Sequence, residues 1–258
     1  MKKKVLLVAA LFVGATTFAQ DGLTSKKGEA FLPEAGDWAI GFDGGAFIDY
    51  VGNMANGTQN NSLSLNNFAN TFYGKMFKDE NTAYRGSLRI GMGSSSQDMP
   101  YGGANGDSLV NVDKVSNGFT FIVGGGIEKR RGAGRLQGVY GAQLMFGMIA
   151  AANTSTDYAE ALSITNTTSR TLETNNGNTM TVGVNAFAGV EYFILPKFSL
   201  GAEVNWGLGF ASTGDSDMVV ESWNGTAAES TTTVTSGASS AFSLDNSVGA
   251  NFKVLFHF

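Results

Sequence analysis

The chain has 258 residues, a formal net charge of −5 and no cysteine. The acidic balance argues against a nucleic-acid partner, which would need a basic face, and the lack of cysteine excludes disulfides, thiolate metal sites and a cysteine-linked lipid anchor. Only 15% of the residues are charged, whereas a soluble domain carries about 25%, and the 35 glycines together with 11% aromatic residues favour a β-barrel in lipid.

Residues 1–19 have the three parts of a secretory signal peptide. A run of three lysines is followed by the apolar segment 5–14 and by small residues that end at Ala19. The apolar segment is too short to span a bilayer as a helix, which needs ~20 residues. We therefore expect export, cleavage after Ala19, and a short periplasmic lead at 20–35 before the first strand.

The remainder of the chain is dominated by alternation of apolar and polar residues with a period of two, which predicts β-strands. In one such stretch, Leu200, Val204 and Trp206 share one face, while Glu203 and Asn205 share the other. In chain order, the expected strands are 36–51, 67–77, 82–93, 117–129, 138–150, 179–193, 198–211 and 241–258. All three prolines lie outside these strands, as expected for a residue that cannot donate to the ladder.

The connections between these strands alternate between short turns and long polar segments. The short turns are 78–81, 130–137 and 194–197, and the long segments are 52–66, 94–116, 151–178 and 212–240. Outer-membrane barrels show this alternation, with the short turns in the periplasm. The sequence therefore predicts an all-β fold, an eight-stranded antiparallel up-and-down transmembrane β-barrel over 36–258, with both of its ends in the periplasm.

The long segments are the candidate contact sites, because loops of this length are usually functional or disordered. Thr/Ser-rich alternation, as at 163–165 and 231–235, predicts hairpins that extend the strands above the membrane. We expect any protein partner to bind these extracellular loops or the lead 21–35. The tripeptide 107–109 (Asp-Ser-Leu) also resembles the O-glycosylation acceptor pattern of exported Bacteroidota proteins.

The end of the sequence places an apolar residue at every second position: Phe252, Val254, Phe256 and Phe258. This pattern resembles the C-terminal signal that the barrel-insertion machinery reads in outer-membrane barrels. With this ending, the strand count and the loop alternation, residues 36–258 resemble the small eight-stranded barrels of the OmpA transmembrane-domain and OmpX type. We do not expect the peptidoglycan-binding role of full-length OmpA in this chain. The stretch 26–38 (KKGEAFLPEAGDW) is similar to small Bacteroidota outer-membrane barrels. The resemblance implies the cell outer membrane of a Gram-negative organism and contact with its lipid.

Counting by alternation places eight charged side chains on the inward face of the expected barrel. They form two levels, with Lys75, Arg85, Glu128 and Glu191 near the periplasmic end and Asp43, Arg89, Glu203 and Lys253 further out. Each level would be balanced, with two cations and two anions. The interior of an eight-stranded barrel is just wide enough for side chains, and an unpaired buried charge costs several kcal/mol. We therefore expect a salt-bridged plug that closes the lumen, with a gated polar pathway as the alternative.

Aromatic residues gather near both ends of the expected strands, which predicts two interfacial girdles. The periplasmic girdle would comprise Trp38, Phe77, Tyr84, Tyr140, Tyr192, Phe198 and Phe258. The outer girdle would comprise Tyr50, Phe68, Phe146, Trp206, Phe210 and Phe242. The glycine run 124–126 lies within an expected strand, where it allows close packing rather than phosphate binding.

The sequence offers little for catalysis. His257, the only histidine, is expected at the rim of the lumen, and no second histidine is present for a Ser/His constellation. The inward carboxylates are expected to be ion-paired, and the loop carboxylates are too sparse for a calcium loop. We therefore expect no enzyme, no metal and no cofactor. The first hypothesis is a closed scaffold that presents loops for surface interactions. The alternatives are an accessory subunit of a larger outer-membrane secretion, assembly or uptake complex, and a narrow pore or conduit for small molecules.

Overall fold

The computed structural model describes residues 24–44, 71–102, 109–132 and 134–258, and this part of the chain is all-β. No helix within it is long and apolar enough to cross a membrane. Its strands are β1 (Trp38–Asp43), β2 (Thr71–Asp79), β3 (Thr82–Gly102), β4 (Leu109–Arg131), β5 (Leu136–Tyr158), β6 (Arg170–Asn175), β7 (Thr179–Leu195), β8 (Phe198–Thr213), β9 (Ser216–Trp223), β10 (Ala228–Ser236) and β11 (Ser239–His257). All pairings between these strands are antiparallel.

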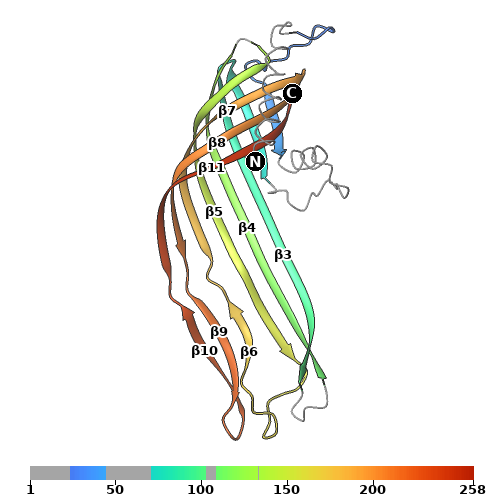
Figure 1. The fold of residues 1–258 in the computed structure, drawn as a ribbon, viewed down its shortest axis with the longest axis vertical. Coiled ribbons are helices and arrows are strands. Elements are labelled where there is room, and N and C mark those ends of the chain that lie inside the picture. Colours follow the sequence, from blue (N-terminus) through green and yellow to red (C-terminus); the bar gives the residue numbers. More distant parts are fainter. Residues whose placement is uncertain (1–23, 45–70, 103–108, 133) are drawn as a thin grey trace, which may run out of the picture.

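Eight of these strands form a closed hydrogen-bonded ring in the order β1, β2, β3, β4, β5, β7, β8 and β11. β1 pairs with β2 on one side and with β11 on the other, and this closes the ring. The short turns that link β4 to β5 and β7 to β8 lie at one end of the ring, at the top of Figure 1. The prediction of an all-β antiparallel fold is confirmed, and the ring is compatible with an eight-stranded barrel.

The lead before β1 is attached to the turn end of the ring. Thr24 and Ala30 form an isolated β-bridge, and the backbone of Gly36 donates a hydrogen bond of 2.8 Å to the Phe77 carbonyl. The buried ring of Phe31 lies under the guanidinium of Arg135, with 3.7 Å between Cζ and the ring centroid. Of the predicted lead 20–35, the described part is therefore packed against the turns.

The sheet continues far beyond the ring on one side (Figure 1). β3 and β4 stay paired as far as Gly102 and Leu109, and β5 pairs with β6, β6 with β9, and β9 with β10. We call this part of β3, β4 and β5, together with β6, β9 and β10, the outer wall. Every residue of β10 is exposed, so the outer wall is a thin sheet with solvent on both sides at its edge.

The outer wall changes two sequence-based predictions. The long loop predicted at 94–116 was wrong, because Ser94 pairs with Asn117 and the ladder runs on to Gly102 and Leu109. The hairpin predicted within 212–240 is confirmed as β9–β10. The strand within 151–178 is β6, and it pairs mainly with β9 rather than forming a hairpin within its own segment. The segments 45–51 and 67–70 of the first two predicted strands, and residues 107 and 108 of the glycosylation tripeptide, lie outside the described residues.

The ring exposes apolar side chains and buries charged ones, which is the reverse of the distribution in a soluble protein. Each ring strand exposes large apolar residues, with one example from each strand being Ile40, Phe72, Ile90, Ile127, Leu144, Val182, Trp206 and Phe256. The fully buried side chains include Arg130, Glu128 and Glu191. Among the described residues, the apolar cluster of buried side chains is small: Ala39, Phe77, Ala83 and Leu255. The assignment of Phe77 to the periplasmic girdle was therefore wrong, because Phe77 shares the inward face of Lys75 two residues before it and is 1% exposed.

Candidate functional site

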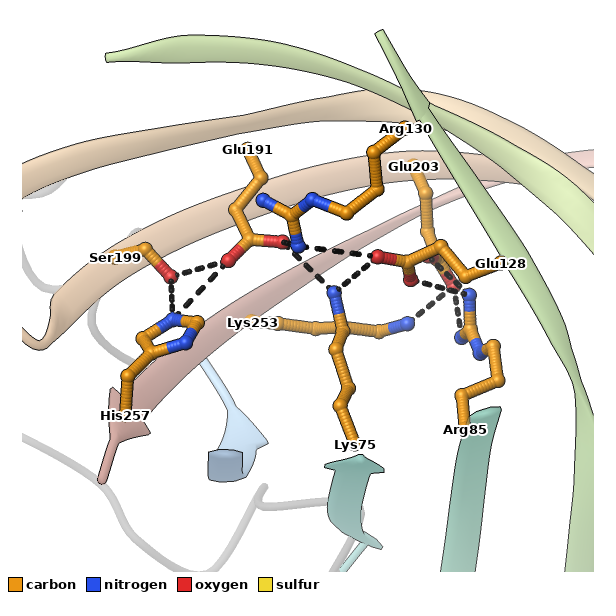
Figure 2. A network of polar contacts seen from close by, with 9 residues as sticks. All are labelled: Lys75, Arg85, Glu128, Arg130, Glu191, Ser199, Glu203, Lys253 and His257. Atoms are coloured by element: carbon orange, nitrogen blue, oxygen red, sulfur yellow. Dashed lines mark hydrogen bonds and ion pairs between the residues drawn. The ribbon is translucent and has the colours of Figure 1, made fainter. Parts of the chain in front are cut away.

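The candidate site is a network of charged side chains that crosses the ring (Figure 2). Lys75 lies between two carboxylates, with its Nζ 2.8 Å from Glu128 Oε1 and 2.7 Å from Glu191 Oε2. Arg130 Nη1 lies 3.4 Å and 3.1 Å from the same two oxygens. Because β2 and β7 stand opposite each other in the ring, the contact between Lys75 and Glu191 joins two opposite walls across the interior.

Arg85 connects these groups with a second set of charges. Its two terminal nitrogens each donate to one Glu203 oxygen at 3.0 Å, a bidentate pair that joins β3 to the opposite strand β8. Arg85 Nη1 also lies 3.7 Å from Glu128 Oε2, and Lys253 Nζ donates to Glu203 Oε1. Its guanidinium lies over the ring of Phe187 at 3.9 Å. Arg85 therefore links the two sets of carboxylates into one network.

A buried hydroxyl and the single histidine complete the network at the turn end. Ser199 Oγ donates to Glu191 Oε1 at 2.6 Å and lies 2.8 Å from His257 Nε2. The imidazole packs against the rings of Phe77 and Phe193, with centroids 5.7 Å and 5.0 Å away. The geometry differs from that of a hydrolase triad, in which the carboxylate binds the second imidazole nitrogen and the serine points at substrate. Here Ser199 is fully buried, and Ser199 and Glu191 both meet the same imidazole nitrogen, Nε2 of His257.

Local sequence explains why the charges fit inside the ring. Glu128 and Arg130 are two residues apart on β4 and so share the inward face. Between and beside the charges, the inward positions are often glycine, as at Gly126, Gly141 and Gly189. A Cβ at any of these three glycines would lie 2.2 Å or less from a carbonyl oxygen of the neighbouring strand. The absence of side chains at these positions lets the strands approach closely.

Six of the eight inward charges predicted from the sequence meet in this network: Lys75, Arg85, Glu128, Glu191, Glu203 and Lys253. Asp43 is half-buried and stands opposite Lys253 in the β1–β11 register. Arg89 is exposed and lies beyond the network on β3.

The predicted division into two balanced levels was wrong. Arg130 adds a cation to the set near the turns, and Arg85 contacts carboxylates of both sets. Sequence reasoning missed Arg130 because it ended the strand at residue 129, two residues before β4 ends at Arg131. The i, i+2 spacing of Arg130 from Glu128 was available as a signal. It also missed Ser199 as a member of the network, and it expected His257 at the rim of the lumen, where the structure has the imidazole buried.

A cavity of about 330 Å³ lies on the outer side of the network. Arg85 and Glu203 line it together with residues two to four positions further out on several ring strands. Within the described residues, no group of three His, Cys, Asp or Glu side chains could hold a metal ion. The chain thus defines an all-β protein with an eight-stranded ring around a charged interior. It matches no protein-family model and no curated protein sequence.

Proposed function

We propose that this protein is an integral outer-membrane β-barrel that acts as a structural and surface-interaction scaffold with a closed lumen. The observation that carries the proposal is the reversed distribution of side chains. A buried charge is rare unless it is paired, and here the charges are buried and paired at the centre of the ring. A soluble monomer seldom exposes an apolar patch larger than a few hundred Å². An apolar belt on every strand of the ring suits a lipid environment.

The backbone supports the same proposal. In a bilayer every backbone polar group needs a partner within the protein, and a closed ring of strands meets that requirement without an edge. The outward aromatic residues near β1 and β11 add to the belt, since Phe256 packs against Phe42 and Phe198 with centroids 6.3 Å and 5.2 Å away. The role of Phe252, Val254, Phe256 and Phe258 as a signal for the insertion machinery, and the location in a Gram-negative outer membrane, stay predictions.

Tryptophan fluorescence can test the membrane assignment, because the chain contains three tryptophans in different places. Trp38 and Trp206 are exposed on the ring at 57% and 51%, and Trp223 is half-buried on the outer wall. Three single-tryptophan variants, with the other two positions changed to Phe, would be folded into vesicles containing lipids brominated on their acyl chains. We expect quenching of Trp206 and Trp38 and none of Trp223, which is the matched control. Equal fluorescence of Trp206 in brominated and plain vesicles would refute the proposal.

Conductance tests the closed lumen. The ion pairs among Lys75, Glu128 and Glu191 block the ring at the level of the turns, and the Arg85–Glu203 pair blocks it again further out. We expect no stable single-channel conductance from the purified full chain in planar bilayers. A steady conductance from the folded wild-type protein would favour the narrow-pore alternative instead.

The outer wall is where a surface-interaction role would act. Its last strand, β10, is exposed along its whole length and is the end of the sheet among the described strands. Purification in mild detergent from the native membrane tests this role. A partner that is lost when the β9–β10 hairpin is deleted supports it, and a stoichiometric partner that is retained after this deletion supports the accessory-subunit alternative.

A further inference from the structure

The cavity on the outer side of the charge network, which we call the outer cavity, has the features of a small ligand site. Its volume of about 330 Å³ is at the small end of the range for ligand pockets, roughly 300–1,000 Å³. The polar side chains that matter here come from six ring strands: Tyr73, Arg89, Gln143, Asn185, Asn205 and Asn251. The ion pairs of Arg85 and Glu203 form its floor.

The amide side chains of this cavity lack good partners within the protein. Gln143 and Asn185 both direct their NH₂ groups at the sulfur of Met145, at 3.6 Å and 2.8 Å, and a thioether is a weak acceptor. Asn205 Oδ1 is buried and accepts no hydrogen bond from the described residues. Buried polar groups are normally satisfied. A ligand with both hydroxyl hydrogens and oxygen acceptors would satisfy these amides.

The charge of the outer cavity indicates the sign of the ligand. Glu203 is neutralised by Arg85 and Lys253. Arg89 lines the outer cavity, is exposed, and forms no ion pair with any residue that the structure describes. A guanidinium recognises a carboxylate in a planar, bidentate manner. Among the residues that the structure describes, the cavity therefore combines the unpaired cation of Arg89 with a group of amides.

We infer that the outer cavity binds a small hydroxylated anion of the sugar-acid class, with its carboxylate on Arg89 and its hydroxyls on Asn205, Asn185 and Gln143. The inference rests on the proposed function only in placing the cavity on the outer side of a membrane barrel. Because the network closes the floor, the ligand enters and leaves from the same side. The site is then one for binding and not for passage through the lumen.

Calorimetric titration of the folded full chain in non-ionic detergent tests this inference. The probes are glucuronate, galacturonate and gluconate, with glucose as the uncharged control. Arg89→Gln removes the cation of the cavity, and Arg131→Gln removes an exposed arginine at the turn end as the matched control. Asn205→Leu removes the unpartnered acceptor. Circular dichroism of each variant verifies that it is folded.

We expect saturable binding of at least one sugar acid and much weaker binding of glucose. Arg89→Gln should weaken that binding roughly tenfold or more, because a hydrogen-bonded charge is lost, and Arg131→Gln should leave it unchanged. Asn205→Leu should weaken it by a smaller factor. The inference is overturned if no sugar acid binds at millimolar concentration, if glucose binds as well as the acids, or if the two arginine variants behave alike. Tryptophan quenching in vesicles is independent of any ligand, so failure of this inference is distinguishable from failure of the membrane assignment.

Discussion

Two neighbouring glycines on β4 allow a sharp test of how closely the ring strands approach. Gly125 faces outward, and a Cβ built on it meets nothing within 4 Å. Gly126 faces inward, and a Cβ there would lie 2.2 Å from the carbonyl oxygen of Ala142 and 2.6 Å from the Cα of Gln143. Both of those atoms belong to the backbone of β5, so rotation of a side chain cannot relieve the clash.

The expected effects of the two alanine variants have opposite signs. Gly126→Ala must push β4 and β5 apart, and overpacking of this kind typically costs about 1–3 kcal/mol. Gly125→Ala adds a methyl group in open space and removes the conformational entropy of a glycine within a strand, worth roughly 0.5–1 kcal/mol in favour of folding. The free energies of unfolding of the two variants should therefore differ by about 1.5–4 kcal/mol.

Equilibrium unfolding in urea, with the protein folded into vesicles, measures this difference. The slope of the transition should be the same for both variants, so that the midpoints compare stability directly. If both variants unfold at the midpoint of the wild type, then the close approach of β4 and β5 at Gly126 does not exist, and the argument that inward glycines permit it is refuted.

Three further results are expected. Glu191→Ala removes the carboxylate shared by two buried cations and should lower the free energy of unfolding in the same assay by about 3–5 kcal/mol, and a loss near zero would show that these cations are not buried. On the outer wall, the hydrogen bond to Asp98 and then the charge of Asp98 raise the pKa of Asp113. The folded form therefore holds the proton more tightly, and stability should fall as pH rises through that pKa. Asp113→Asn should remove this loss, and hydrogen exchange of the outer wall as a function of pH measures it. At the turn after β2, the backbone N–H of Asn81 lowers the pKa of Asp79, so its stabilising contribution is present at neutral pH and is lost on acidification. An NMR titration with an ordinary aspartate pKa at Asp79 would contradict this.

Alternation in the sequence was sufficient to place most of the ring, because strands with one apolar and one polar face leave a strong period of two. The same parity identified Lys75 and Glu191 as inward. It failed where one face does not differ from the other, as along 94–98, where the side chains of both faces are exposed and no apolar face is needed. Phe77 was wrongly assigned to the outward girdle because its aromatic type was given more weight than its position in the alternation, which it shares with the inward Lys75.

The partners within the network could not be read from the sequence. Arg85 and Glu203 are separated by 118 residues, and they meet because their strands stand opposite each other once the ring has closed. Strand parity predicts which side chains point inward, but it does not predict the level of each side chain along the ring or which carboxylate pairs with each cation. The link through Arg85 depends on the stagger of the strands, which is a property of the whole ring.

The seam between β1 and β11 has a consequence for the order of assembly. Trp38 and Phe258 exchange two backbone hydrogen bonds there, of 3.2 Å and 2.8 Å, and β11 also delivers Lys253 and His257 to the carboxylates inside. β11 pairs with β8, so Lys253 and His257 can reach Glu203 and Glu191 before the seam forms. Lys75 of β2 and Arg85 of β3 reach the same two carboxylates only once the ring has closed. Pairing across so long a stretch of chain is a slow step. The pairing of the charges and the closure of the ring are therefore completed together. A ring that stops before this step would hold carboxylates without all of their cations in its interior.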